Sequence, residues 1–160
     1  MLISLAVLLV PAALIYAWFS RVPDEPEVAP ANWQPVVAQA REAGEMTVLA
    51  PTALPETWKP IRARLAASEL QLGFLSPDEV YHDVKQRPGA SQPAFVRNVT
   101  REGVKEGSTT LSGREWTRYV SSDERTRCLV NVVEKPKPTT TVTCADAPYE
   151  AVEAFASTLA

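Results

Sequence analysis

The sequence has no excess of basic residues. Its 160 residues include 16 Lys and Arg against 19 Asp and Glu, which gives a formal net charge of −3. A protein that binds nucleic acid normally carries enough basic residues to displace the counterions of the phosphate backbone. We therefore expect no nucleic-acid partner.

Histidine and cysteine are also scarce, with one His and two Cys in the whole chain. A tetrahedral zinc site needs four ligands, which these three side chains do not supply. His82 alternates with two valines on one side of an expected strand, whereas Asp83 points to the other side. No nucleophile motif of the hydrolase type accompanies it. We therefore interpret His82 as a partly buried structural residue in preference to a catalytic base, and expect no metal site and no cofactor.

Residues 1–20 contain no charged side chain and are almost entirely apolar. A helix of this length spans about 30 Å, the thickness of the hydrocarbon core of a bilayer. Tyr16, Trp18 and Phe19 lie near its end, where aromatic rings favour the headgroup region. The segment predicts a transmembrane helix. The alternative is a secretory signal cleaved after the A-x-A-like tripeptide at 29–31, but the apolar run is longer than usual for a signal and lacks a basic prefix.

Residues 21–31 form a second kind of segment, with three prolines and three acidic residues. This composition is typical of an extended spacer. Arg21 alone would favour the opposite orientation, but the acidic residues that follow it and a pair of cysteines in the rest of the chain favour placing the C-terminal part outside the cytoplasm. We expect residues 32–160 to form one extracytoplasmic domain on the cell membrane.

The pattern of this domain predicts the α+β class, with a mostly antiparallel, twisted sheet packed by two or three helices. After a short apolar run at 46–50 and a proline-rich loop, most segments alternate apolar and polar residues, as strands do. The expected strands are 61–65, 70–74, 80–84, 109–111, 114–120, 126–133 and 139–144.

Three segments have the spacing of helices. The first begins at a cap on Asn32 and ends at Gly44, and a short one is expected over 92–101. The last follows Asp146 and should lie across the sheet. Its apolar stripe consists of Tyr149, Val152, Phe155 and Leu159.

The two cysteines fall opposite each other if the last two strands form a hairpin. Pairing about Pro136, the centre of the loop EKPKP, places Cys128 opposite Cys144. Opposed residues of an antiparallel pair have Cα atoms about 4.5–5.5 Å apart, which a disulfide can bridge. The register therefore predicts a disulfide, which requires an oxidising compartment. Two buried free thiols are the alternative.

Large aromatic residues are the candidates for contact with a ligand or partner. Trp116 and Tyr119 lie on opposite sides of one strand unless a bulge intervenes, so that one of them should reach the surface or a groove. Filling the core is the alternative role for each aromatic residue. The candidates are Trp58, Phe74, Tyr81, Trp116 and Tyr119.

Arg62 and Arg64 alternate on a predicted strand and share a face. They are candidates for contact with anionic lipid headgroups. A solvated sheet face, on which basic residues pair weakly with nearby acids, is the alternative.

Several motifs resemble those of a known group of proteins. Besides the apolar segment and the acidic spacer, they are LPETWKP, LGFLSPDEVY, GREWTRY and the terminal APYEAVEAFASTLA. On these motifs the chain resembles a family of small actinobacterial single-pass membrane proteins of uncharacterised function. The resemblance implies an extracytoplasmic domain tethered to the membrane, without an established activity and therefore without catalytic residues to assign.

Together these inferences predict a non-catalytic binding or accessory module of a cell-envelope protein complex. Its expected partners are the membrane, through residues 1–20, and a membrane or envelope protein that covers an exposed apolar patch. Two alternatives stay open. One is a domain that binds a lipid or small molecule in a cavity lined by aromatic residues. The other is an envelope hydrolase with two carboxyl groups about 5–9.5 Å apart.

Overall fold

The computed structural model describes residues 30–160. The predicted transmembrane segment at 1–20 and most of the predicted spacer at 21–31 lie outside the described residues. Within 30–160, none of the helices combines the length and the apolar character needed to cross a bilayer.

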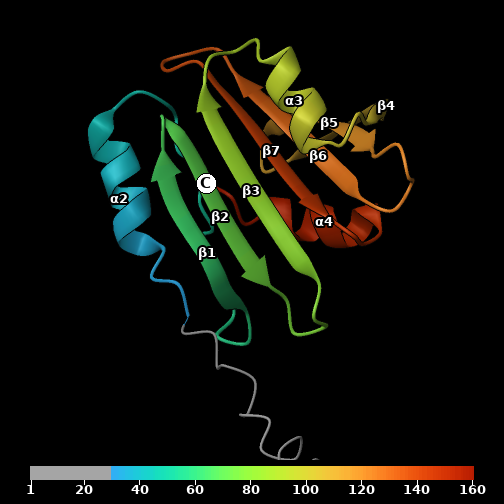
Figure 1. Ribbon diagram of the computed structural model, residues 1–160, viewed down its shortest axis with the longest axis horizontal. Helices are drawn as coiled ribbons and strands as arrows, with labels where there is room; N and C mark the ends of the chain where they lie inside the picture. The colour runs from blue at the N-terminus through green and yellow to red at the C-terminus, as the bar shows by residue number, and fades with distance from the viewer. Residues whose placement is uncertain (1–29) are drawn as a thin grey trace, which may run out of the picture.

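The described residues form one seven-stranded antiparallel sheet with three helices packed against it (Figure 1). The predicted class and the antiparallel sheet are therefore confirmed. The strands run in the spatial order β1-β2-β3-β7-β6-β5-β4, so that the last strand in the chain lies at the centre. They are β1 (Lys59–Ala66), β2 (Glu69–Leu75), β3 (Tyr81–Pro88), β4 (Val104–Leu111), β5 (Arg114–Val120), β6 (Arg127–Val133) and β7 (Thr139–Ala145).

The predicted strands differ from the observed ones mainly at their ends. β5 has the predicted bounds, and β6 and β7 differ from the prediction by one residue each. The prediction is wrong for the start of β4, which begins at Val104 and not at residue 109. A bulge between Lys105 and Gly107 breaks the alternation on which the prediction depends.

The helices are α2 (Gln34–Ala43), α3 (Pro93–Val99) and α4 (Tyr149–Ala156). The predicted cap on Asn32 is wrong, because the N-cap of α2 is Trp33 and no side chain caps this end. Pro35, in the first turn, has no N–H that would need a cap. Gly44 ends the helix as predicted, in the left-handed conformation with φ of 69°.

Leu159 is buried as predicted, but it does not belong to a helix. α4 ends at Ala156, a turn follows at Ser157 and Thr158, and Leu159 lies in an isolated β-bridge. The backbones of Ala50 and Ala160 exchange two hydrogen bonds of 3.1 and 3.2 Å, and Pro51 forms a β-bridge with Leu159. The last residues of the sequence are therefore paired with the segment that follows α2.

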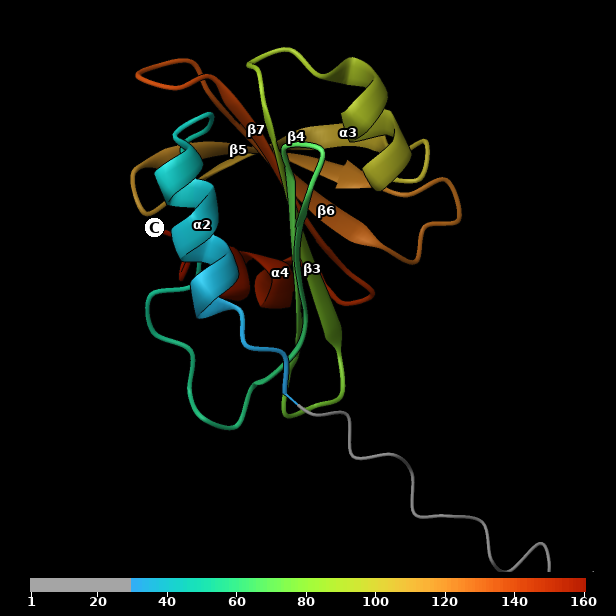
Figure 2. The ribbon, with the colours of Figure 1, turned by 60° about the vertical axis from the view of Figure 1, so that its left-hand side comes forward.

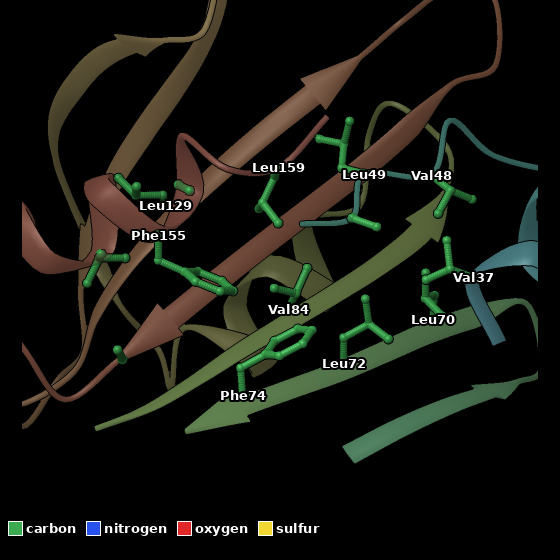
Figure 3. Packing of buried hydrophobic residues seen from close by; sticks show 14 of the residues in the cluster. Val37, Val48, Leu49, Leu70, Leu72, Phe74, Val84, Leu129, Phe155 and Leu159 are labelled. Carbon is green, nitrogen blue, oxygen red and sulfur yellow. The ribbon is translucent and has the colours of Figure 1, made fainter. Parts of the chain in front are cut away.

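α2 and α4 lie on one side of the sheet and α3 lies on the other (Figure 2). We call these two sides the inner face and the outer face. The main core fills the inner face, where alternate residues of β2 and β3 meet α2, α4 and the apolar run at 46–50 (Figure 3). Its largest members include Leu49, Leu70, Leu72, Phe74, Trp116, Leu129, Phe155 and Leu159.

The run at 46–50 crosses this core without joining the ladder of the sheet. The side-chain amide of Gln86 takes the place of a partner strand: its Nε2 donates to the carbonyl of Leu49 at 2.6 Å, and its Oε1 accepts from the N–H of Leu49 at 2.8 Å. Gln86 has no exposed surface. Its amide thus satisfies two backbone groups that burial would otherwise leave unpaired.

A smaller core lies on the outer face under α3. Phe95 of α3 packs there against Val130, Val142 and the two cysteines. Cys128 pairs with Cys144 across β6 and β7, with Cα atoms 4.1 Å apart and the sulfur atoms bonded. The predicted register is confirmed, and it brings the two cysteines together in a way that is compatible with the predicted disulfide.

Candidate functional site

His82, the only histidine, lies on the inner face inside a group of aromatic rings. Its ring centre is 5.0 Å from that of Trp58 and 4.8 Å from that of Phe155. Its Nδ1 is buried without a hydrogen-bond partner among the described residues. Burial lowers the pKa of His82 from 6.5 to about 4, because the apolar surroundings disfavour the charged form. The ring is more fully buried than the predicted partial burial, with 2% of its surface exposed.

Three of the candidate aromatic residues belong to the same inner face. Phe74 and Trp116 are almost completely buried, and Trp58 stacks on Phe155 with ring centres 5.3 Å apart. These side chains fill the core. Tyr81 and Tyr119 remain as candidates that reach the outer face.

Trp116 and Tyr119 point to opposite faces of β5, as the alternation predicts. Trp116 enters the main core, and Tyr119 packs beside the smaller core on the outer face. Because α3 has only seven residues, it covers the middle of the outer face and leaves the strands on both sides of it open (Figure 1). The candidate surfaces of the protein lie in these two open parts.

The first surface is a groove of about 380 Å³ between α3 and strands β5 and β6, which we call the α3 groove. Val130 and Val132 of β6, Tyr119 of β5 and Val96 of α3 provide its apolar lining. Val132 is 46% exposed and is one of three large apolar or aromatic residues that are exposed in the described part of the chain. Thr117 and Thr140 add hydroxyl groups beside the apolar side chains. This combination fits an apolar side chain of a partner better than an ion.

The second surface is a hollow of about 330 Å³ at the start of β3 and the end of β7, which we call the β3–β7 hollow. Its lining includes the carboxyl groups of Glu79, Asp83 and Asp146, the guanidinium of Arg101 and the ring of Tyr81. An opening lined in this way suits a polar or charged ligand and not an acyl chain.

A short hydrogen-bonded chain organises one wall of the β3–β7 hollow. Arg101 donates to the hydroxyl of Thr126 at 3.1 Å, and that hydroxyl donates to the carboxylate of Asp146. Arg101 and the next residue both have φ of 56°, in the left-handed region that side chains other than glycine seldom adopt. The turn after α3 thus holds the Arg101 guanidinium at the edge of the hollow.

Tyr81 lies between the hollow and the open face of β1, β2 and β3. Its ring covers Gly73 of β2, where a Cβ atom would collide with the ring. Burial raises the pKa of Tyr81, the carboxylate of Asp83 raises it further, and the positive charge of Arg62 opposes these effects. The tyrosine is still 36% exposed.

Arg62 and Arg64 share the outer face of β1, as predicted. They pair in register with Gly73 and Gln71 of β2, and both are exposed. The described residues contain no acidic group in an ion pair with either arginine. The sequence analysis thus named both the two arginines and Tyr81 as candidates, but it did not predict that Tyr81 lies beside Arg62.

Other residues of the candidate surfaces carried no clear signal in the sequence. Arg101 and Asp146 are 45 positions apart and meet only because the turn after α3 reaches the end of β7. Val132 continues the alternation of Val130 in β6, which could have marked it as an outer-face residue. In residues 30–160, no group of three or more His, Cys, Asp or Glu side chains is arranged to hold a metal ion.

Comparison with known proteins gives one match. The model of a family described as "Protein of unknown function (DUF4245)" matches residues 1–159. No curated protein and no solved structure matches the chain.

Proposed function

The chain belongs to DUF4245, a family of proteins of unknown function, and we propose that it is a membrane-anchored, extracytoplasmic binding module. In this proposal it is a non-catalytic accessory subunit of a cell-envelope protein complex. Residues 1–20 provide the anchor, residues 21–31 the spacer, and the sheet domain the binding surface. The α3 groove is the surface that meets the partner protein.

One observation carries this proposal: the outer face of the sheet is covered by a single short helix. Beside that helix, Val132 of β6 and Tyr119 of β5 expose apolar surface, and the disulfide joins β6 to its other neighbour, β7. An exposed valine flanked by an aromatic ring and hydroxyl groups resembles the apolar centre and polar rim of a protein interface. The area is small, so we expect a partner that inserts one or two apolar side chains.

The absence of a partner for His82 supports a binding role over a hydrolytic one. Its Nδ1 has no hydrogen-bond partner among the described residues, and its ring lies beside those of Trp58 and Phe155. A general base must lie within hydrogen-bond reach of the proton it abstracts. His82 therefore contributes to packing in this proposal.

The test is photocrosslinking in the native membrane. A benzophenone side chain replaces Val132 in the full chain, and a second version carries it at Gln39, an exposed position of α2. After illumination, affinity purification and mass spectrometry, we expect one reproducible protein adduct from position 132 and none from position 39. Equal adducts from both positions, or none from position 132, would overturn the assignment of the α3 groove.

A matched pair of substitutions distinguishes an effect on partner binding at the α3 groove from an effect on folding. Val132→Asp places a charge among Val96, Val130 and Tyr119 and should reduce recovery of the partner at least about tenfold, which is the effect of losing about 1.4 kcal/mol of binding free energy. Gln39→Asp should leave recovery unchanged. Both variants should unfold near the temperature of the parent protein, because both positions are exposed.

A second candidate function rests on the β3–β7 hollow. Its size matches the lower limit of cavities that bind small molecules, and Tyr81, one of the candidate aromatic residues, lines it. Its carboxyl and guanidinium groups favour a small zwitterionic or cationic ligand. Native mass spectrometry of the full chain released from its own membrane is the test, and a retained small molecule that Asp83→Asn releases would support this function.

A further inference from the structure

We propose that the open outer face of β1–β3 is a contact surface for the anionic phospholipid headgroups of the membrane that holds the protein. The residues that form this contact are Arg62, Arg64 and Tyr81. The inference deepens the proposed function and rests on it, because it requires that the chain be anchored through residues 1–20.

The first argument is the balance of charge on this face. The acidic residues of the face are already neutralised: Asp83 pairs with Lys85 at 3.1 Å and Glu69 with Arg87 at 2.8 Å. The two arginines of β1 stay unpaired among the described residues. The open face therefore has a surplus of two positive charges, both on the edge strand.

The acids nearest to this face lie outside the strands that form it. Asp78 and Glu79 occupy the turn between β2 and β3, and Glu79 lines the β3–β7 hollow. Their charges therefore belong to the turn and not to the strand face on which Arg62 and Arg64 lie. Two guanidinium groups two residues apart on one strand face are spaced to meet two neighbouring phosphate groups, and Arg is well suited to bind phosphate.

The second argument is the place at which the chain enters the domain. The N–H of Ala31 donates to the carbonyl of Pro60 at 2.8 Å, at the beginning of β1 (Figure 1). Arg62 and Arg64 follow two and four residues later, which corresponds to about 7 and 13 Å along the strand. The basic edge is thus the part of the open face nearest to the attachment of the predicted spacer.

The third argument is the position of Tyr81. Its ring covers Gly73, the register partner of Arg62, and it is one of only three large apolar or aromatic residues that are exposed in the described part of the chain. Tyrosine is enriched at the membrane interface, where its ring contacts the lipid and its hydroxyl group stays hydrated. Two arginines and a tyrosine together match the chemistry of that interface.

The experiment uses the full chain in lipid nanodiscs of phosphatidylcholine, with or without phosphatidylglycerol. A benzophenone side chain replaces Tyr81, or Thr110 of β4 at the opposite edge as the control. After illumination, mass spectrometry measures the lipid adducts. We expect adducts at position 81 to increase at least about fivefold with phosphatidylglycerol, since each basic residue near an anionic surface contributes about that factor. Adducts at position 110 should not change.

Substitutions connect the effect to the arginines. Arg62→Ser with Arg64→Ser should abolish the increase with phosphatidylglycerol, whereas Arg125→Ser, on an exposed turn, should not. Three results would overturn this inference and leave the proposed function intact. The adducts could be equal in both lipids, they could persist after the double substitution, or they could join position 81 to residues 21–29 instead of lipid. If the full chain fails to enter the discs at all, the proposed membrane anchor is overturned and the inference with it.

Discussion

At the scale of single residues, His82 couples the stability of the core to pH. In the folded protein, burial lowers its pKa to about 4, whereas the unfolded chain binds a proton near pH 6.5. The unfolded state therefore binds more protons between these values, and the free energy of unfolding must decrease as the pH falls from 7 to 4.

We expect this decrease to amount to about 2 kcal/mol between pH 7 and 5 and to about 3 kcal/mol at pH 4. Urea denaturation at a series of pH values measures it. His82→Leu keeps an apolar side chain between Trp58 and Phe155 and should remove the decrease between pH 7 and 5. If the variant shows the same decrease as the parent protein, another group is responsible.

Gln86 is a second residue whose role depends on burial. Its amide holds the backbone of Leu49 through two hydrogen bonds in the main core. Gln86→Leu has a similar size but leaves both backbone groups of Leu49 without partners, at a cost of about 1–3 kcal/mol for each buried group. We expect the free energy of unfolding to fall by about 3 kcal/mol.

Gln71→Leu is the matched control for this prediction. Gln71 lies on the outer face of the neighbouring strand, half-buried, and its amide donates only to Glu69. Its replacement should change the free energy of unfolding by less than about 1 kcal/mol. Equal losses for the two substitutions would show that the run at 46–50 does not depend on the Gln86 amide.

At the scale of secondary-structure elements, antiparallel backbone pairing and the disulfide between Cys128 and Cys144 join β6 and β7 in a hairpin. The bridge closes a loop with a sequence separation of 16 residues. A loop of that length restricts the unfolded chain by about 3 kcal/mol. We expect Cys128→Ser with Cys144→Ser to lower the free energy of unfolding by that amount.

The same measurement with a reductant provides the control. Dithiothreitol should destabilise the parent protein about as much as the double substitution does, and it should have no effect on the substituted protein. Two results would show that the parent protein has two free thiols instead of the bridge. It could react with a maleimide before reduction, or its free energy of unfolding could be unchanged by dithiothreitol.

Other elements show which features the local spacing of residues predicts and which it does not. α2 ends at Gly44 as predicted because a left-handed residue that ends a helix is a local requirement. The start of β4 was not predictable, since the bulge near Gly107 suits the pairing with β5 and leaves no periodic trace. Leu159 reaches the core through pairing with Pro51, more than a hundred residues earlier, which no local spacing encodes.

At the scale of the whole molecule, the testable property is its location. Four lysines of the domain are exposed, namely Lys59, Lys105, Lys135 and Lys137. A membrane-impermeant amine reagent should therefore modify them in intact cells if the domain lies outside the cytoplasm. A cytosolic protein of the same cells, which should stay unmodified, is the control. Modification that occurs only after the cells are permeabilised would contradict the extracytoplasmic placement and would undermine both proposed surfaces.

The sequence alone determined the features that depend on neighbours in the chain. Alternation located the strands, and the loop centred on Pro136 set the register that joins Cys128 to Cys144. The opposite directions of Trp116 and Tyr119 followed from the same period of two. These features need only the geometry of one strand or one hairpin, so local residues are sufficient to specify them.

Only the tertiary structure decided which strands became neighbours and which faces stayed open. The pairing of β3 with β7 joins residues more than fifty positions apart and places Tyr81 at the edge of a hollow beside Arg101. Because α3 covers only part of the outer face, Val132 lies in a groove and the arginines of β1 lie on an open surface. Contacts of this kind arise from the packing of remote segments against one another, and the spacing of residues along the chain does not record them.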